Sequence, residues 1–127
     1  MVYRDYLKIT LKLIAIITII SGLVQMLSPG FVLGFIGGVI TDSTLHFFAI
    51  IGMFMVMFGG LLLHALSGTQ NHPVAVLWCS LQKYGAAVAV SLGVINGLFS
   101  WLAVGVALFD LFSGILITMH WYGIIRK

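Results

Sequence analysis

Residues 73–95 read PVAVLWCSLQKYGAAVAVSLGVI, and residues 99–125 read FSWLAVGVALFDLFSGILITMHWYGII. Each segment is long and apolar enough to cross a hydrocarbon core of about 30 Å, and each carries one charged residue near its middle, Lys83 or Asp110. A charge at the centre of a bilayer costs about 2.5–3.5 kcal/mol on translocon-insertion scales. Two opposite charges in neighbouring spans therefore predict an ion pair inside a membrane bundle.

Two further apolar segments precede this pair, at roughly residues 6–27 and 44–66. Between them, residues 31–40 are apolar but too short to span a bilayer, so we expect an interfacial or re-entrant segment that packs on the bundle. Ser28-Pro29-Gly30 ends the first span, because proline disfavours continuation of a helix. The sequence therefore predicts an all-α integral membrane protein, a single four-helix transmembrane domain over residues 1–127.

The composition predicts a surface covered by lipid. Of the 127 residues, 61% are hydrophobic and 7% are charged, whereas soluble domains carry about 25% charged residues. Positive residues cluster at the chain ends, where Arg4, Lys8 and Lys12 form a basic stripe at the membrane surface and Arg126-Lys127 close the chain. Four crossings place both termini on one side, which the positive-inside rule makes the cytoplasmic side or its equivalent. The basic pI does not indicate nucleic-acid binding.

The depths of Lys83 and Asp110 agree. Lys83 lies ten residues beyond Pro73, and Asp110 lies twelve residues before Tyr122, so they lie about 15 and 18 Å below the same surface at 1.5 Å per residue. A structural clamp that fixes helix register is the favoured interpretation, because no second acid continues a proton relay; a proton or ligand site is the alternative. Three residues lie close enough in the sequence to satisfy the remaining hydrogen-bonding groups: Gln82, Tyr84 and Ser113.

Small residues recur every four positions in both of these segments. Residues of this size let another helix approach closely. We expect the two stripes to face each other and to enclose the charged pair, with docking of a partner protein on the first stripe as the alternative. The first stripe comprises Gly85, Ala89, Gly93 and Gly97, and the second comprises Asp110, Gly114 and Thr118.

The histidines offer a weaker hypothesis. His64, His72 and His120 fall near the basic end of the spans and His46 near the other end. Facing histidines at one depth can ligate a haem, and one histidine can ligate a pigment, but the favoured interpretation places them in the wet interface. Cys79 is the only cysteine, which excludes an internal disulfide and a CxxC centre. No metal site is predicted, and no cofactor is identified.

Residues 28–127 resemble small four-helix bacterial membrane proteins of the DoxX-like group. The resemblance rests on four short motifs: Ser28-Pro29-Gly30, Gly59-Gly60-Leu61-Leu62, Gln82-Lys83-Tyr84 and Asp110-Leu111-Phe112-Ser113-Gly114. It implies a four-helix membrane fold. A few members of that group are subunits of quinone-linked oxidoreductases, and distant relatives bind sterols or lipids. This chain lacks the glutamate and arginine features of a catalytic member.

These observations lead to two functional hypotheses from different classes. The first is a non-enzymatic small integral membrane subunit of a larger respiratory or photosynthetic assembly, whose partners are the lipid bilayer and protein chains, or a second copy, within the membrane. The alternative is a binder of a small hydrophobic molecule, such as a quinone, lipid or isoprenoid, in a pocket beside Lys83 and Asp110. An enzyme is the least supported class, since no acid–base constellation accompanies the pair.

Overall fold

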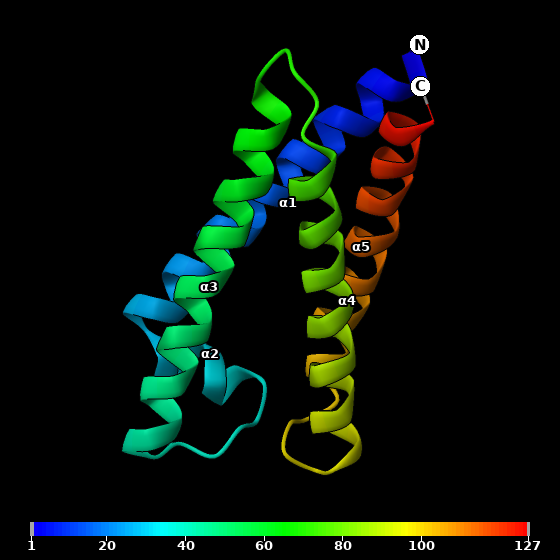
Figure 1. Ribbon diagram of the computed structural model, residues 1–127. Coiled ribbons are helices and arrows are strands. Elements are labelled where there is room, and N and C mark those ends of the chain that lie inside the picture. The colour runs from blue at the N-terminus through cyan, green and yellow to red at the C-terminus, as the bar shows by residue number, and fades with distance from the viewer. Residues whose placement is uncertain (1, 127) are drawn as a thin grey trace.

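The computed structural model describes residues 2–126, which form five helices and no strand (Figure 1). Lys127, counted above among the basic residues of the chain end, lies outside the described residues. Four helices are long and apolar enough to cross a membrane, which confirms the predicted all-α membrane bundle. The helices are α1 (Val2–Leu27), the short α2 (Pro29–Phe35), α3 (Asp42–Ser67), α4 (Pro73–Ile95) and α5 (Ala103–Ile125).

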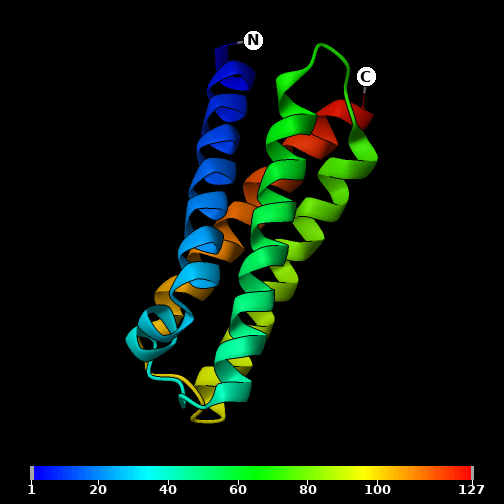
Figure 2. The same cartoon turned by 90° about the vertical axis from the view of Figure 1, so that its left-hand side faces the viewer.

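The four spanning helices run alternately in opposite directions. Both ends of the chain therefore lie at one end of the bundle, together with the loop between α3 and α4 (Figures 1 and 2). We call this the basic end, because Arg4, Lys8 and Arg126 lie there. The helix α2 and the loop between α4 and α5 lie at the opposite, distal end. The short apolar segment predicted between the first two spans is thus represented by α2.

The spans form two tightly packed pairs, α1 with α3 and α4 with α5, and the pairs touch each other less closely. The seam of the first pair is built from glycines. A Cβ atom on Gly22 would lie 2.6 Å from the carbonyl oxygen of Gly52, and a Cβ on Gly59 would lie 3.0 Å from that of Ala15. Backbones approach this closely only where side chains are absent, so these glycines fix how α1 crosses α3.

The apolar core is divided along the bundle axis. The cluster nearer the basic end takes residues from α1, α3, α4 and α5: Leu7, Leu11, Ile14, Ala15, Leu62, Leu66, Val76, Cys79 and Ile117. The cluster at the distal end centres on Leu33, Ile36 and Ala103, with Phe48 and Phe99 packed against it. Along α4, Lys83 falls between Cys79 of the first cluster and Val90, which packs against the second; along α5, Asp110 falls between the buried residues Ala103 and Ile117. The charged pair therefore separates two apolar layers.

Two helix caps, one after α2 and one after α4, lie at the distal end. Gly37 and Gly97 have φ angles of +78° and +74°, the left-handed conformation that glycine adopts without strain. In both caps the next amide donates back to the last helical turn, Gly38 to Leu33 and Leu98 to Gly93, which is the Schellman arrangement.

The last helix begins later than the sequence indicates. The amide of Ser100 donates to the carbonyl oxygen of Ile36 at 2.7 Å, and the ring of Phe99 packs over Gly93. These contacts hold the connection in a turn, so α5 begins at Ala103, four residues after the rough start expected at Phe99.

Candidate functional site

Helical periodicity turns both charged residues into the bundle. The buried positions of α4 include Val76, Cys79, Ser80, Lys83 and Ala87, which recur every three or four residues. On α5 the buried positions are Ala103, Ala107, Asp110, Ser113, Gly114 and Ile117, with the same spacing. Residues at these intervals share one helix face. Lys83 and Asp110 therefore lie on the faces by which α4 and α5 pack.

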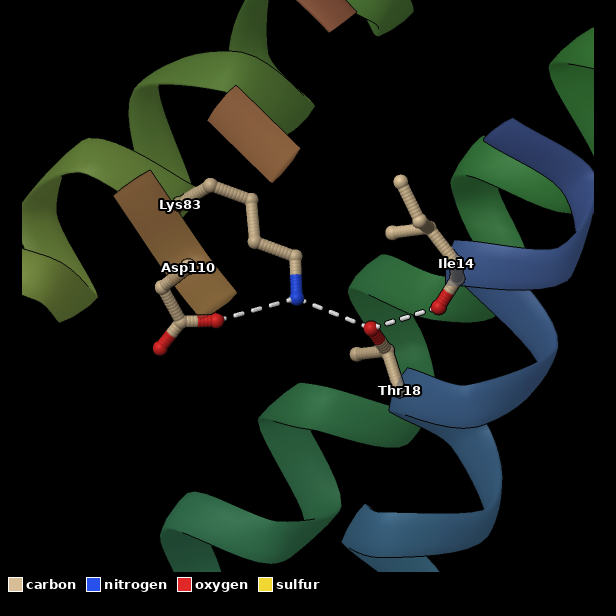
Figure 3. Close-up of polar contacts among 4 residues, drawn as sticks. All are labelled: Ile14, Thr18, Lys83 and Asp110. Atoms are coloured by element: carbon tan, nitrogen blue, oxygen red, sulfur yellow. Dashed lines mark hydrogen bonds and ion pairs between the residues drawn. The ribbon is translucent and has the colours of Figure 1, made fainter. Parts of the chain in front are cut away.

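The expected contact between the two charges is present. Lys83 Nζ lies 3.2 Å from Asp110 Oδ1, and only 6% and 12% of the two side chains are exposed. Lys83 Nζ also donates to Thr18 Oγ1 at 2.8 Å, and Thr18 Oγ1 donates to the carbonyl oxygen of Ile14 at 2.9 Å (Figure 3). The ring of Phe109 lies below the ammonium, 5.3 Å from centroid to Nζ. We call Lys83, Asp110 and Thr18 the buried polar cluster.

The buried polar cluster joins the two helix pairs. Lys83 and Asp110 belong to α4 and α5, and Thr18 belongs to α1. The threonine hydroxyl has one proton, which it donates to Ile14, so it meets Lys83 as an acceptor. An ammonium that donates to a carboxylate and a hydroxyl has no lone pair with which to attack a substrate. The geometry suits a structural role in which the Lys83 charge is neutralised and the register between the helices is fixed. It therefore favours the structural-clamp interpretation.

Sequence reasoning missed Thr18 and assigned other partners. Tyr84 Oη instead lies 2.8 Å from Thr118 Oγ1, and Gln82 makes no hydrogen bond to the pair within residues 2–126. Ser113 Oγ is buried with no hydrogen-bond partner in the described part of the chain. The expectation that Gln82, Tyr84 and Ser113 satisfy the pair is therefore wrong.

Depth along the first helix is the one sequence signal that agrees with the position of Thr18. This residue lies twelve residues beyond Tyr6, which is about 18 Å at 1.5 Å per residue and matches the depth of the two charges.

The small-residue stripes do not face each other. Gly85 and Ala89 are exposed, and no atom lies within 4 Å of the place where a Cβ on Gly85 would stand. Gly93 packs under Phe99, Gly97 is the helix cap, and Gly114 lies against the ring of Tyr84. Gly85 is two residues beyond Lys83, a rotation of about 200° along a helix. Because Lys83 faces inward, the Gly85–Ala89 edge faces outward, and the prediction of internal packing is wrong there.

None of the four histidines is fully buried in the bundle. His46, His64 and His72 are exposed, and His120 is half-buried. No group of three His, Cys, Asp or Glu side chains able to hold a metal ion is found over residues 2–126. Cys79 is buried, and its Sγ lies 3.7 Å from the carbonyl oxygen of Phe58, to which it donates. Haem or pigment ligation by His46, His64 or His120 stays a prediction.

Two clefts open near the basic end, and neither is lined by Lys83 or Asp110. The first, of about 660 Å³, lies between α3 and α4. Its walls are mainly apolar and aromatic: Phe58, Leu61, Asn71, His72, Pro73, Val74, Ala75 and Trp78. The second, of about 630 Å³, lies between the first turns of α1 and the last turns of α5 and carries most of the charged residues of that end.

Comparison of the chain with models of protein families, with curated proteins and with solved structures finds no match in any of the three. The resemblance to the DoxX-like group therefore stays a prediction, and the geometry described above carries the functional argument.

Proposed function

We propose that this integral membrane protein is a non-enzymatic subunit that packs among other helices of a larger membrane assembly. The observation that carries the proposal is the rotation of α4. The ion pair turns Lys83 inward, and the same rotation presents Gly85 and Ala89 on the outer surface beside the exposed side chains of Leu81, Val88 and Leu92. Small residues on an outer face let a further helix approach closely.

Two other features support this proposal. The intramembrane charges are used to hold the two helix pairs together, which is a scaffold's use of them. Helices account for 84% of the chain and leave little of residues 2–126 outside the bilayer, which suits a subunit of a respiratory or photosynthetic assembly. In this proposal the basic end faces the cytoplasm or the equivalent negative side.

The test is association after mild detergent extraction. Native mass spectrometry should find the chain bound to other membrane proteins or to a second copy of itself. Gly85→Leu should abolish that association and leave the helix content unchanged, because a Cβ at this outward-facing position has no atom of this chain within 4 Å. Gly60→Leu is the matched control, since Gly60 on α3 is equally free of neighbours. A wild-type chain that always purifies alone would refute the proposal.

A second candidate function follows from the cleft between α3 and α4. Its volume of about 660 Å³ lies within the range of small-molecule sites, which are lined mostly by apolar and aromatic groups. A quinone, lipid or isoprenoid would lie there against Phe58, Leu61 and Trp78, and not beside the buried pair as the sequence had indicated. Mass spectrometry of extracted lipid would identify such a ligand.

A short-chain quinone provides a direct test of this second candidate. If it enters the cleft, it should quench the fluorescence of Trp78, which lines that cleft. The quenching should be lost in Trp78→Phe and kept in Trp101→Phe, whose side chain is exposed at the distal end. Equal quenching in the two variants would show partitioning into the micelle and would exclude this site.

A further inference from the structure

The second cleft gathers positive charge from both ends of the chain. Arg4 and Lys8 reach it from α1, and Arg126 reaches it from the end of α5. Lys12, one turn further along α1, does not line the cleft. The basic stripe of the sequence is therefore divided by the fold: its first two members share a cleft with Arg126, and its third does not.

The charge balance of the cleft is positive. Asp5 is the one acidic side chain among the lining residues, set against Arg4, Lys8 and Arg126. The backbone adds little, because α1 begins and α5 ends here, and the positive and negative ends of the two helix dipoles oppose each other. The guanidinium of Arg126 lies over the ring of Tyr122, 5.1 Å from the centroid. A guanidinium stacked in this way keeps donors on its edge, which suits a phosphate.

The cleft also has an apolar side. Leu7, Met119 and Ile124 line it together with the charged residues, and exposed apolar side chains such as Ile9 and Leu13 continue along α1 toward the membrane interior. A free phosphate would use only the charged part. A phospholipid has both a phosphate and acyl chains, so its two parts match the two kinds of wall. Basic pockets between membrane helices on the cytoplasmic side are suited to such headgroups.

We infer that the cleft between α1 and α5 at the basic end is a binding site for an anionic phospholipid. Arg4, Lys8 and Arg126 hold the phosphate, and the acyl chains lie on the outer faces of α1 and α5. Because these residues come from the first turns of α1 and the end of α5, a bound lipid ties the first and last helices together at the basic end. This site is separate from the outer face of α4 and does not depend on any partner protein.

Native mass spectrometry in detergent tests this inference, because no bilayer is present to attract cations in general. The wild-type chain should retain dioleoyl phosphatidylglycerol in preference to dioleoyl phosphatidylcholine. Arg126→Gln should weaken retention of phosphatidylglycerol roughly fivefold, the factor expected for one basic residue near an anionic surface. The double variant Lys8→Gln/Arg126→Gln should weaken it by roughly the square of that factor. Equal retention of the two lipids by the wild-type chain would overturn the inference.

Lys12→Gln is the matched control, since it removes one positive charge from the same helix face outside the cleft. It should change lipid retention less than twofold, compared with the roughly fivefold change expected for a basic residue that contacts the lipid. Equal effects of Lys12→Gln and Arg126→Gln would show general attraction and would overturn the site. Glycerol 1-phosphate supplied at the lipid's concentration should not displace the lipid. Displacement would identify a phosphate site indifferent to acyl chains and would overturn the assignment to a lipid.

Discussion

Replacing Lys83 by methionine removes the cation of the buried polar cluster and leaves the Asp110 carboxylate inside the bundle, where 12% of its side chain is exposed. Removing one partner of a buried pair typically costs about 3–5 kcal/mol. Asp110→Leu strands Lys83, which keeps its 2.8 Å hydrogen bond to Thr18, so its cost should lie toward the lower end of that range. The double variant Lys83→Met/Asp110→Leu buries no charge and should be nearly as stable as the wild type.

Thr18 is the third residue of the buried polar cluster and can be added to this double-mutant comparison. In the wild type, Thr18→Val removes an acceptor from a charged donor, which should cost about 1.5–3 kcal/mol. In the double variant the same substitution removes nothing that depends on Lys83, so its cost should fall to near zero. This difference separates a polar cluster from three unrelated polar residues.

The free energy of unfolding can be measured for all of these variants in mixed micelles, by raising the fraction of dodecyl sulfate and following helix content by circular dichroism. The decisive comparison is between the double variant and the two single variants. If the double variant is as unstable as the sum of the single variants, Lys83 and Asp110 do not stabilise each other. If both single variants are as stable as the wild type, the charges reach water or a partner and do not act as a clamp.

Three further predictions follow from the packing. Gly52→Ala should lower the free energy of unfolding by about 1–3 kcal/mol, as overpacking does, because the added Cβ would lie 2.7 Å from the carbonyl oxygen of Gly22. The control Gly60→Ala on the same helix should be neutral or stabilising by up to about 1 kcal/mol. Equal costs of the two substitutions in the same unfolding assay would contradict close packing of α1 and α3 at these glycines. Ser113→Ala should be neutral or stabilising, because it removes a buried hydroxyl that has no partner within residues 2–126; a loss of more than about 1 kcal/mol, the net worth of an ordinary hydrogen bond, would mean that the hydroxyl is bonded. Single cysteines placed at Asn71, in the loop between α3 and α4, and at Asn96, in the loop between α4 and α5, should react with an impermeant thiol reagent from opposite sides of the membrane in a Cys79→Ala background. The α3–α4 loop lies at the end of the bundle that holds the termini (Figure 1), and labelling of both positions from one side would refute the topology.

The ion pair could be predicted because an unpaired charge inside a membrane is costly and because depth along a helix can be counted from the sequence. Lys83 and Asp110 are charges in apolar segments, and depth along a helix follows from counting residues. The contact between them at 3.2 Å follows from that count and from the short reversal at Asn96. Thr18 gave no comparable signal, because a threonine hydroxyl in a helix is satisfied by its own backbone, as it is here by Ile14.

The helix seams could not be predicted from spacing alone. Every-four spacing shows that small residues share a helix face, but it does not show which way that face turns. On α4 the direction is set by Lys83, and the stripe that begins at Gly85 lies on the other side. The glycines that do form a seam, Gly22 and Gly52, have no charged residue within nine positions along the chain to fix their rotation, so only the packed structure identifies them.

The buried polar cluster also bears on how the chain enters the membrane during synthesis. The helix α4 has the lowest mean hydropathy of the four candidate spans, and it carries Lys83, whose partner Asp110 follows 27 residues later. At about 5–20 residues per second, the lysine leaves the ribosome roughly one to five seconds before the aspartate that neutralises it. We therefore expect α4 and α5 to be inserted together as a hairpin, whereas α1 and α3, whose glycine seam carries no charge, can pair as soon as α3 has been made.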